Sequence, residues 1–432
     1  MPASASQRDA REFVYGPPVR LRCISALRYI IHQARRDGVR KEGWGYLSFL
    51  DKPGRSLIRT ILVTLVVSLL AAGCQLPQVP DYEATPLPSA VRIAYLDGRN
   101  LNLMRADGSD TILLASDLQP TECAPYYVSP NGQWIAYQQA DDGLWIVPTD
   151  GQQPVMLSEK LVGSVSWFPD SSGMVYTLND DVYAQWLDTT QPPQALAVGG
   201  RRYLFPTWSP DGKYIAFLET TTDSTVFNVI LIHSDGTGWR TLGTTAPQSS
   251  ERQLCPDVIA WSPDSTRFMV DFGEPAFVFY VSGGSPAKVG TGIAPTHYDW
   301  SSDGRSLTYQ DEAGRLWVAK ADASEHRQLT DFPVSDAVWS PQDSQIAYIA
   351  QRSDNTTLEV VSAETGEIRS ITGADSYIES SPHWTPDGTL LIFVRYTVQG
   401  QSAGIWHAPL DGSAPPERLA LTGDTIQVFA VR

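Results

Sequence analysis

The sequence predicts an all-β protein, an eight-bladed β-propeller closed by pairing of its N- and C-terminal strands. Three observations predict this fold. A tryptophan-centred phrase recurs from residue 90 to the end, one strand of the phrase has eight copies, and the first copy lacks the opening strand with which the chain ends. A propeller blade typically has four strands in about 40 to 45 residues.

The phrase begins with Trp-Ser-Pro-Asp-Gly or a variant of it, and an apolar strand such as Ile215-Ala216-Phe217 follows. A second apolar strand then ends in Asp-Gly, and a short strand ends near Leu-Thr. Large flat side chains before the turn can fill the wedge between neighbouring blades, so we interpret the tryptophans as structural. The anchor positions, 39 to 53 residues apart, are Val128, Trp167, Trp208, Trp261, Trp300, Trp339 and Trp384.

The turn after the anchor has its complete form in Ser209-Pro210-Asp211-Gly212. Proline presets φ, aspartate accepts a hydrogen bond from the backbone that follows, and glycine adopts the positive φ that closes a hairpin. Two repeats relax this chemistry, with Pro169-Asp170-Ser171-Ser172 and Pro341-Gln342-Asp343-Ser344 in the same place.

The number of blades follows from the second strand, which recurs eight times from Ile93-Ala94-Tyr95 to Leu391-Ile392-Phe393. The first copy has no tryptophan-bearing strand before it, and residues 425–431 form an opening strand with no repeat after it. We therefore expect the two ends to pair, because closure protects strand edges that would otherwise template aggregation. Seven blades with a separate N-terminal hairpin are the alternative.

Residues 51–74 have the pattern of a bacterial lipoprotein signal peptide. Basic residues precede the uncharged stretch 60–72, which is short for a membrane span. The segment from Leu70 that ends in Gly73 and Cys74 resembles a lipobox, in which signal peptidase cuts between these two residues and the cysteine receives diacylglycerol. An uncleaved signal anchor is the alternative. Either outcome exports the body of the protein and keeps it at the membrane.

The other parts of the chain differ clearly in composition. Residues 1–50 contain nine Lys and Arg and show no sign of a folded domain, so we interpret them as a misassigned start or a cytoplasmic extension. Residues 75–89 contain four prolines and are expected to form an extended spacer. Residues 90–432 form the expected propeller.

The charge of the chain is divided unevenly. Residues 1–74 hold 12 of the 32 Lys and Arg and 5 of the 48 Asp and Glu, so the rest of the chain carries a formal charge of −23. Such a surface repels phosphate backbones, and we expect no nucleic-acid partner.

The recurring phrase resembles the TolB-type propeller repeat, a relative of the WD repeat, over residues 90–432. The resemblance implies a propeller but no single function, because such repeats occur in envelope scaffolds, in prolyl-oligopeptidase-like enzymes and in uncharacterised lipoproteins. TolB itself has an additional α/β domain before a six-bladed ring. The sequence has no room for that domain, so the partners of TolB are not carried over.

Two kinds of sequence pattern, for a catalytic serine and for a metal site, do not support such a site in this chain. The run from Gly400 to Gly404 fits the G-x-S-x-G nucleophile elbow, but that elbow needs a strand-to-helix turn, whereas Ser402 lies between two expected strands. The six histidines form no metal-binding pair, and no calcium loop is present. We therefore expect no catalytic residue, no metal and no cofactor.

First strands line the central channel of a propeller, so their leading ends converge at one mouth. Acidic and histidine side chains near these ends are expected to face a common funnel, where a small polar or cationic ligand would bind. Solvated loop residues with no shared ligand are the alternative. The funnel candidates are Asp257, His297, Asp299, Asp336, Glu379 and His383.

Two cysteines of the body, Cys123 and Cys255, lie five and six residues before their blade anchors, three blades apart. Export permits a disulfide, but the two loops would have to approach each other across the mouth. A disulfide between them and two free thiols both remain open.

These features favour a lipid-anchored, extracytoplasmic propeller of the bacterial envelope. We expect it to be a scaffold that binds a protein, peptide or glycan and to be no enzyme. An enzyme that uses the acidic residues of the channel mouth is the alternative, because paired carboxyl groups can serve glycosyl chemistry.

Overall fold

The computed structural model divides the chain into two units, residues 1–81 and 82–432, and describes residues of the second unit only. The described residues run from 91 to 431, with gaps at 119–125, 140–142, 161, 189–190, 222–225, 246–257, 272–275, 291–295, 343, 353–354, 374–376 and 421–425. The expected leader, signal peptide and linker therefore lie outside the described residues. So do Gly73, Cys74, Cys123, Cys255 and Asp257.

The described residues form β-strands and no helix, which confirms the prediction of an all-β chain. Their strands form antiparallel sheets, most of which have four strands in chain order. The first sheet contains β1 (Arg92–Asp97), β2 (Asn100–Arg105), β3 (Ile112–Ala115) and β31 (Ile426–Val431). The second contains β4 (Tyr126–Val128), β5 (Trp134–Gln139), β6 (Gly143–Pro148) and β7 (Val155–Ser158). The third contains β8 (Val165–Trp167), β9 (Gly173–Leu178), β10 (Asp181–Trp186) and β11 (Gln194–Ala197).

Three further sheets follow the same pattern. One contains β12 (Arg202–Trp208), β13 (Tyr214–Thr220), β14 (Phe227–His233) and β15 (Arg240–Thr245). The next contains β16 (Ile259–Trp261), β17 (Arg267–Val270), β18 (Phe277–Tyr280) and β19 (Ala287–Lys288). Another contains β27 (Tyr377–Trp384), β28 (Leu390–Thr397), β29 (Ser402–Pro409) and β30 (Glu417–Ala420).

One sheet has seven strands because its central strand is long. Its strands are β20 (Thr296–Trp300), β21 (Ser306–Gln310), β22 (Arg315–Lys320), β23 (Arg327–Trp339), β24 (Gln345–Arg352), β25 (Asn355–Ser362) and β26 (Ile368–Ser370). The first part of β23 pairs with β22, and its last part, from Val334, pairs with β24. The fourth strand of one repeat thus continues into the first strand of the next.

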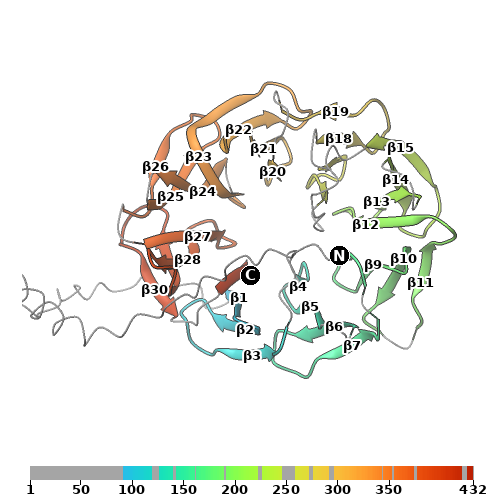
Figure 1. Cartoon of the computed structure of the whole chain (residues 1–432), viewed down its shortest axis with the longest axis horizontal. Helices are drawn as coiled ribbons and strands as arrows, with labels where there is room; N and C mark the ends of the chain where they lie inside the picture. The colour runs from blue at the N-terminus through green and yellow to red at the C-terminus, as the bar shows by residue number, and fades with distance from the viewer. Residues whose placement is uncertain are drawn as a thin grey trace, which may run out of the picture. The chain divides into compact units, whose positions relative to one another are not determined.

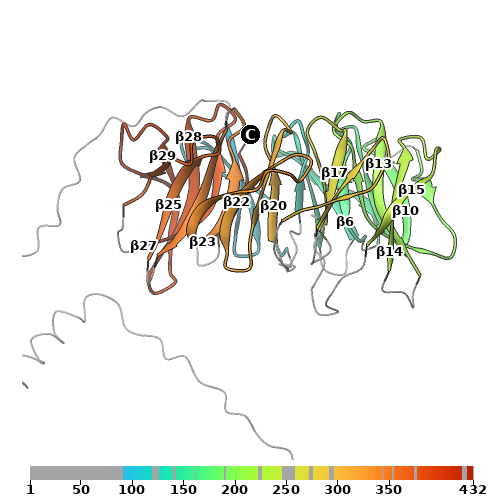
Figure 2. The same cartoon turned by 90° about the horizontal axis from the view of Figure 1, so that it is seen from above.

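Within residues 82–432 the sheets stand around a ring, with the first strand of each repeat nearest the centre (Figure 1). The side view shows the strands running along the axis of this ring (Figure 2). The C-terminal strand β31 pairs antiparallel with β1, from Asp97 opposite Ile426 to Ile93 opposite Val431. The expected pairing of the last strand with the first sheet is therefore present.

The apolar core lies between consecutive sheets rather than at one centre. One buried cluster, for example, joins Val175 and Val182 of the third sheet to Ile215 and Phe217 of the fourth. This arrangement follows from strands that are apolar on both faces, since each face packs against a neighbouring sheet.

The anchor tryptophans bind each sheet to the one before it. Most donate the indole Nε1–H to a backbone carbonyl in the first strand of the preceding repeat, as Trp300 does to the Ala260 oxygen at 3.0 Å. Trp167, Trp261 and Trp384 make the same bond, at 2.9, 3.2 and 3.1 Å. Trp339 instead donates to the Thr308 hydroxyl, in the second strand of the preceding repeat, at 3.2 Å. The structural interpretation of these residues thus agrees with their contacts.

Trp208 departs from this pattern. Phe168 stands where other repeats carry serine or threonine, and its ring packs against the Trp208 ring with centroids 4.2 Å apart. Among the described residues, the buried Trp208 Nε1 then has no hydrogen-bond acceptor.

The turns after the anchors form as their sequence predicts. Asp211 accepts hydrogen bonds from the Ser209 hydroxyl at 2.8 Å and the Lys213 amide at 3.1 Å. The buried Ser209 hydroxyl in turn accepts the amide of Tyr214 at 2.9 Å. The turn is therefore closed by side chains as well as by its backbone.

Two turns that carry serine in place of the glycine contain a bond that the sequence did not reveal. Ser171 and Ser265 occupy the glycine position with φ of 62° and 57°. Their hydroxyls accept backbone amides of the preceding sheet, Ser171 from Asn131 at 3.0 Å and Ser265 from Asp211 at 2.9 Å. Serine thus adopts a conformation that favours glycine and, in return, joins two sheets.

We predict that Ser265→Ala lowers the free energy of unfolding by about 1–2 kcal/mol, because the Asp211 amide loses its acceptor while the unfavourable φ remains. Ser265→Gly is the matched control, since it loses the same bond but relieves the backbone, and it should be the more stable of the two. Urea denaturation followed by tryptophan fluorescence measures both. An alanine variant as stable as the wild type would show that the inter-sheet bond contributes nothing.

Candidate functional site

The strand directions define two faces of the ring. First strands end at the turns after the anchors, so these turns share one face with the connections between third and fourth strands; we call it the turn face. The hairpins between second and third strands, such as the one that joins Asp97 to Asn100, lie on the opposite face, the mouth face. Strand β1 begins and β31 ends on the turn face.

Asp299 and Asp336, two of the expected funnel residues, bind backbone of the following first strand. Asp299 accepts the amide of Trp300 in its own strand at 2.8 Å through Oδ1, and its Oδ2 accepts the amide of Trp339 in the following first strand at 3.5 Å. Asp336 accepts the amide of Ser381 at 3.2 Å through Oδ2. Both carboxylates therefore help to hold consecutive first strands together.

The same contact occurs elsewhere with serine in place of aspartate. The Ser164 hydroxyl accepts the amide of Phe205 at 2.9 Å, and Ser164 stands three residues before its anchor, as Asp336 does. This repetition indicates that the position serves the ring, whichever acceptor occupies it.

A β-bulge in these first strands turns the backbone amides toward the first strand of the preceding repeat. The register with the second strand shifts between Ser335 and Val338 and between Ser380 and His383. Asp336 and Ser381, inside these bulges, have φ of 53° and 51°. A bulge bends its strand and turns side chains and amides away from the regular ladder.

Glu379 corrects one expectation. It was expected to face the funnel, but its side chain is fully buried and pairs with Arg395, Oε1 to Nη2 at 3.2 Å. Its Oε2 accepts the Thr356 hydroxyl at 2.9 Å, so the glutamate also joins two sheets. Because Glu379 lies opposite Arg395 in the strand pair, it points to the flank of the sheet rather than into the channel.

Arg395 is a residue that the sequence analysis missed. Its side chain is 4% exposed, and its guanidinium lies 4.9 and 4.7 Å from the ring centroids of Tyr377 and Trp406. Such cation–π contacts and the Glu379 carboxylate replace the water that a buried charge loses. The signal in the sequence was an arginine inside the apolar strand Leu390–Thr397.

The histidines of the funnel are less informative. His383 is half-buried, with its Nδ1 3.0 Å from the Ser381 carbonyl oxygen. His297 belongs to β20, and its side chain lies outside the described residues, as does the whole of Asp257. Within the described part of the chain, no group of three His, Cys, Asp or Glu residues could hold a metal ion.

The G-x-S-x-G motif has a structural cause. Its last glycine, Gly404, has φ of 101° in β29, and a Cβ there would lie 2.1 Å from the Ala420 carbonyl oxygen of β30. Glycine is required for this close approach of backbones. Ser402 accepts the Gly404 amide at 3.1 Å in the hairpin, in agreement with the interpretation of the motif as a hairpin loop.

Aspartates of the turn face remain ionised to low pH. Hydrogen bonds from Ser109 lower the pKa of Asp107, those from Thr237 lower the pKa of Asp235, and those from Ser413 lower the pKa of Asp411. A carboxyl pKa that is lower in the folded than in the unfolded state stabilises the fold at pH values above the ordinary aspartate pKa. This stabilisation is lost as the pH falls through the pKa of the folded state. These three aspartates are therefore ionised at neutral pH.

In the part of the chain that the structure describes, no helix has the length and apolar character needed to cross a membrane. No family model matches the chain. An uncharacterized protein of Agrobacterium fabrum is 24% identical over 239 residues, which cover 52% of this chain and 74% of that protein.

Solved structures give the fold. Dihydro-heme d1 dehydrogenase NirN is similar with a TM-score of 0.52 at 13% identity, over 79% of this chain and 77% of that one. A prolyl endopeptidase matches with a TM-score of 0.47 at 14% identity over 81% of this chain, which spans 61% of that enzyme. A putative TolB from Agrobacterium tumefaciens matches with a TM-score of 0.35 at 17% identity, over 63% of this chain and 92% of that one. With its ring of antiparallel sheets, the chain has a β-propeller fold.

Proposed function

We propose that this chain is a lipid-anchored propeller of the bacterial envelope and binds a protein, peptide or glycan through its mouth face. One observation carries the proposal for a scaffold over an enzyme. The acidic side chains that catalysis would need are bonded to the ring itself, Asp299 and Asp336 to backbone amides and Glu379 to Arg395. A general acid or base has to be free to reach a substrate.

The positions of the chain ends support the choice of face. Both β1 and β31 reach the turn face, and Cys74 precedes Val91 by 17 residues. An extended segment of that length reaches at most about 60 Å. The chain thus enters the ring on the turn face, which supports the mouth face as the proposed binding face.

We further propose that the ring has eight blades and is closed by β31. The seven-stranded sheet counts as two blades that share β23, since each half of that strand pairs with a different neighbour. The first blade then takes its innermost strand from the C-terminus. Closure of this kind removes the open edges that one missing strand would leave.

Removal of residues 426–432 tests closure. We expect the truncated protein to lose about 3 kcal/mol or more of unfolding free energy and to self-associate, because the edge of β1 loses its backbone partners. Urea denaturation and light scattering measure the two effects, and a synthetic peptide of the deleted residues should restore stability. Deletion of residues 1–81 is the control. A truncated protein that unfolds at the same urea concentration as the wild type would contradict closure by this strand.

Substitution of Asp299 and Asp336 distinguishes a binding scaffold from an enzyme. We expect no turnover of a panel of glycosides and uronides by the wild type, and a loss of about 1–2 kcal/mol of stability in Asp299→Ala and in Asp336→Ala, because backbone amides lose their acceptors. The variant with Asp299→Asn and Asp336→Asn, which keeps acceptor oxygens, should stay close to wild-type stability. Turnover that this double variant reduces by about a hundredfold or more would favour the enzyme instead.

Photocrosslinking in intact membranes tests binding and its face. A benzoyl-phenylalanine at Gln399, on an exposed mouth-face hairpin, should capture a partner, whereas the same residue at Lys213 on the turn face should not. The Cys74→Ser variant should leave the membrane fraction. Adducts from Lys213 alone, or from neither position, would count against the proposed mouth-face scaffold.

A further inference from the structure

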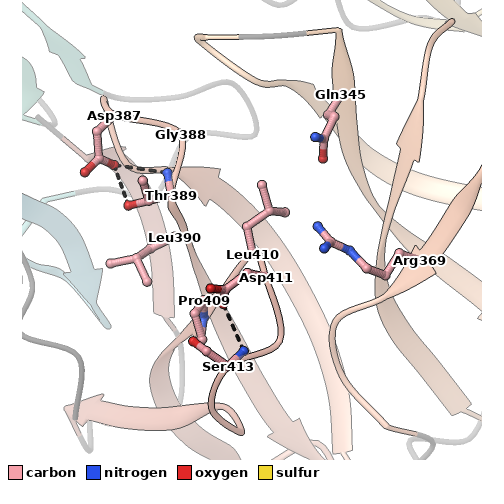
Figure 3. A pocket seen from close by; sticks show the side chains of 10 residues that line it. All are labelled: Gln345, Arg369, Asp387, Gly388, Thr389, Leu390, Pro409, Leu410, Asp411 and Ser413. Carbon is pink, nitrogen blue, oxygen red and sulfur yellow. Dashed lines mark hydrogen bonds between the residues drawn. The ribbon is translucent and has the colours of Figure 1, made fainter.

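A pocket on the turn face lies between two consecutive repeats of the ring. It has a volume of about 440 Å³ and is far from the channel mouth. Gln345 of β24 and Arg369 of β26 form one wall. The turn that contains Asp387 and the connection that contains Asp411 form the other (Figure 3). The volume is within the range of sites that bind small molecules.

Arg369 supplies a positive charge to this pocket, and this charge contributes to the lowered pKa of Asp411. Its guanidinium has no hydrogen bond or ion pair among the residues that the structure describes, in contrast to arginines such as Arg315 and Arg352, which pair with carboxylates. Figure 3 shows it pointing toward the space beside Leu410, on the side of the pocket opposite the aspartates. A guanidinium in this position can bind both oxygens of a carboxylate or phosphate.

The opposite wall supplies two oriented negative charges. Asp387 accepts the amide and hydroxyl of Thr389 through Oδ1, at 3.1 and 2.9 Å. Asp411 accepts the Ser413 amide at 2.9 Å, again through Oδ1. Hydrogen bonds from the neighbouring threonines and serine lower the pKa of both carboxyl groups, so both are ionised at neutral pH. Within the described part of the chain, neither Oδ2 has a hydrogen-bond or ion-pair partner.

We propose that this pocket binds a small zwitterion, whose acidic group contacts Arg369 and whose primary ammonium contacts Asp387 and Asp411. The charges of the two walls favour a ligand that carries both signs. A lone anion would meet two carboxylates and a metal cation would meet the guanidinium, whereas a zwitterion can contact both walls. The Leu410 side chain, which extends into the pocket in Figure 3, offers contact to the carbon atoms between the two charged groups.

This chemistry has two sources in a bacterial envelope, a peptide or amino acid and an ethanolamine phosphate head group. Both carry a primary ammonium a few bonds from an anionic group. The proposal concerns the turn face and does not depend on the function assigned to the mouth face, so either can fail without the other.

Calorimetry with the purified protein tests the proposal, with glycylglycine and phosphoethanolamine as probes. We expect saturable binding of at least one probe. Acetate and methylamine each carry only one of the two charges. Their affinity should be lower than that of the better probe by about tenfold or more, because each loses a charge-assisted contact. Preference for glycylglycine would assign the site to peptides, and preference for phosphoethanolamine would assign it to lipid head groups. Absence of saturable binding by both probes would overturn the proposal.

Variants locate the binding. Arg369→Gln and Asp411→Asn should each weaken the binding of the preferred probe about tenfold or more, since each removes one charge-assisted contact. Arg418→Gln is the matched control, because Arg418 is an exposed arginine of the neighbouring strand β30 and does not line the pocket. Unfolding curves check that the variants fold. Equal affinity in the wild type and Arg369→Gln would also overturn the proposal.

Discussion

The ring depends on contacts between consecutive first strands. The indole of one repeat donates to the carbonyl group before the anchor of the previous repeat, as Trp384 does to Val338. Each bond lies beside a buried tryptophan ring, where an unpaired carbonyl would lose its hydration. Loss of one anchor thus removes apolar packing and leaves a backbone acceptor unsatisfied, and such large-to-small changes cost about 3–5 kcal/mol. The repeat is constrained most strongly here because packing and hydrogen bonding require the same residue.

The same constraint binds polar side chains near the anchors to backbone amides of the ring. Asp336 and Ser164 occupy equivalent positions and accept equivalent amides. The charge of Asp336 is therefore not needed for the bond, since serine also forms it. A carboxylate adds a stronger acceptor and leaves a partial negative potential at the mouth.

Sequence reasoning predicted the periodic features of the fold and missed those that depend on three-dimensional pairing. The anchors and turns were predictable because tryptophan and Ser-Pro-Asp-Gly determine local structure directly. The burial of Glu379 was not, because it depends on the strand register that places Arg395 opposite. The positive φ of Asp336 was equally hidden, since no glycine or proline marks its bulge. Ser265 interrupted the turn pattern, and its compensating bond to the preceding sheet cannot be read from one repeat.

The turns also orient two carboxylates that line the pocket between the repeats. In the turn of the last sheet, one oxygen of Asp387 is occupied by Thr389, which fixes the orientation of the carboxylate and leaves the second oxygen to the pocket. Asp411 is fixed by Ser413 in the same manner. Because folding has already immobilised both side chains, a ligand that binds them loses little additional side-chain entropy. The repeat provides such aspartates in many turns, but in this pocket they face Arg369, a guanidinium without a partner in the described residues, and that pairing of charges makes this pocket specific for a dipolar ligand.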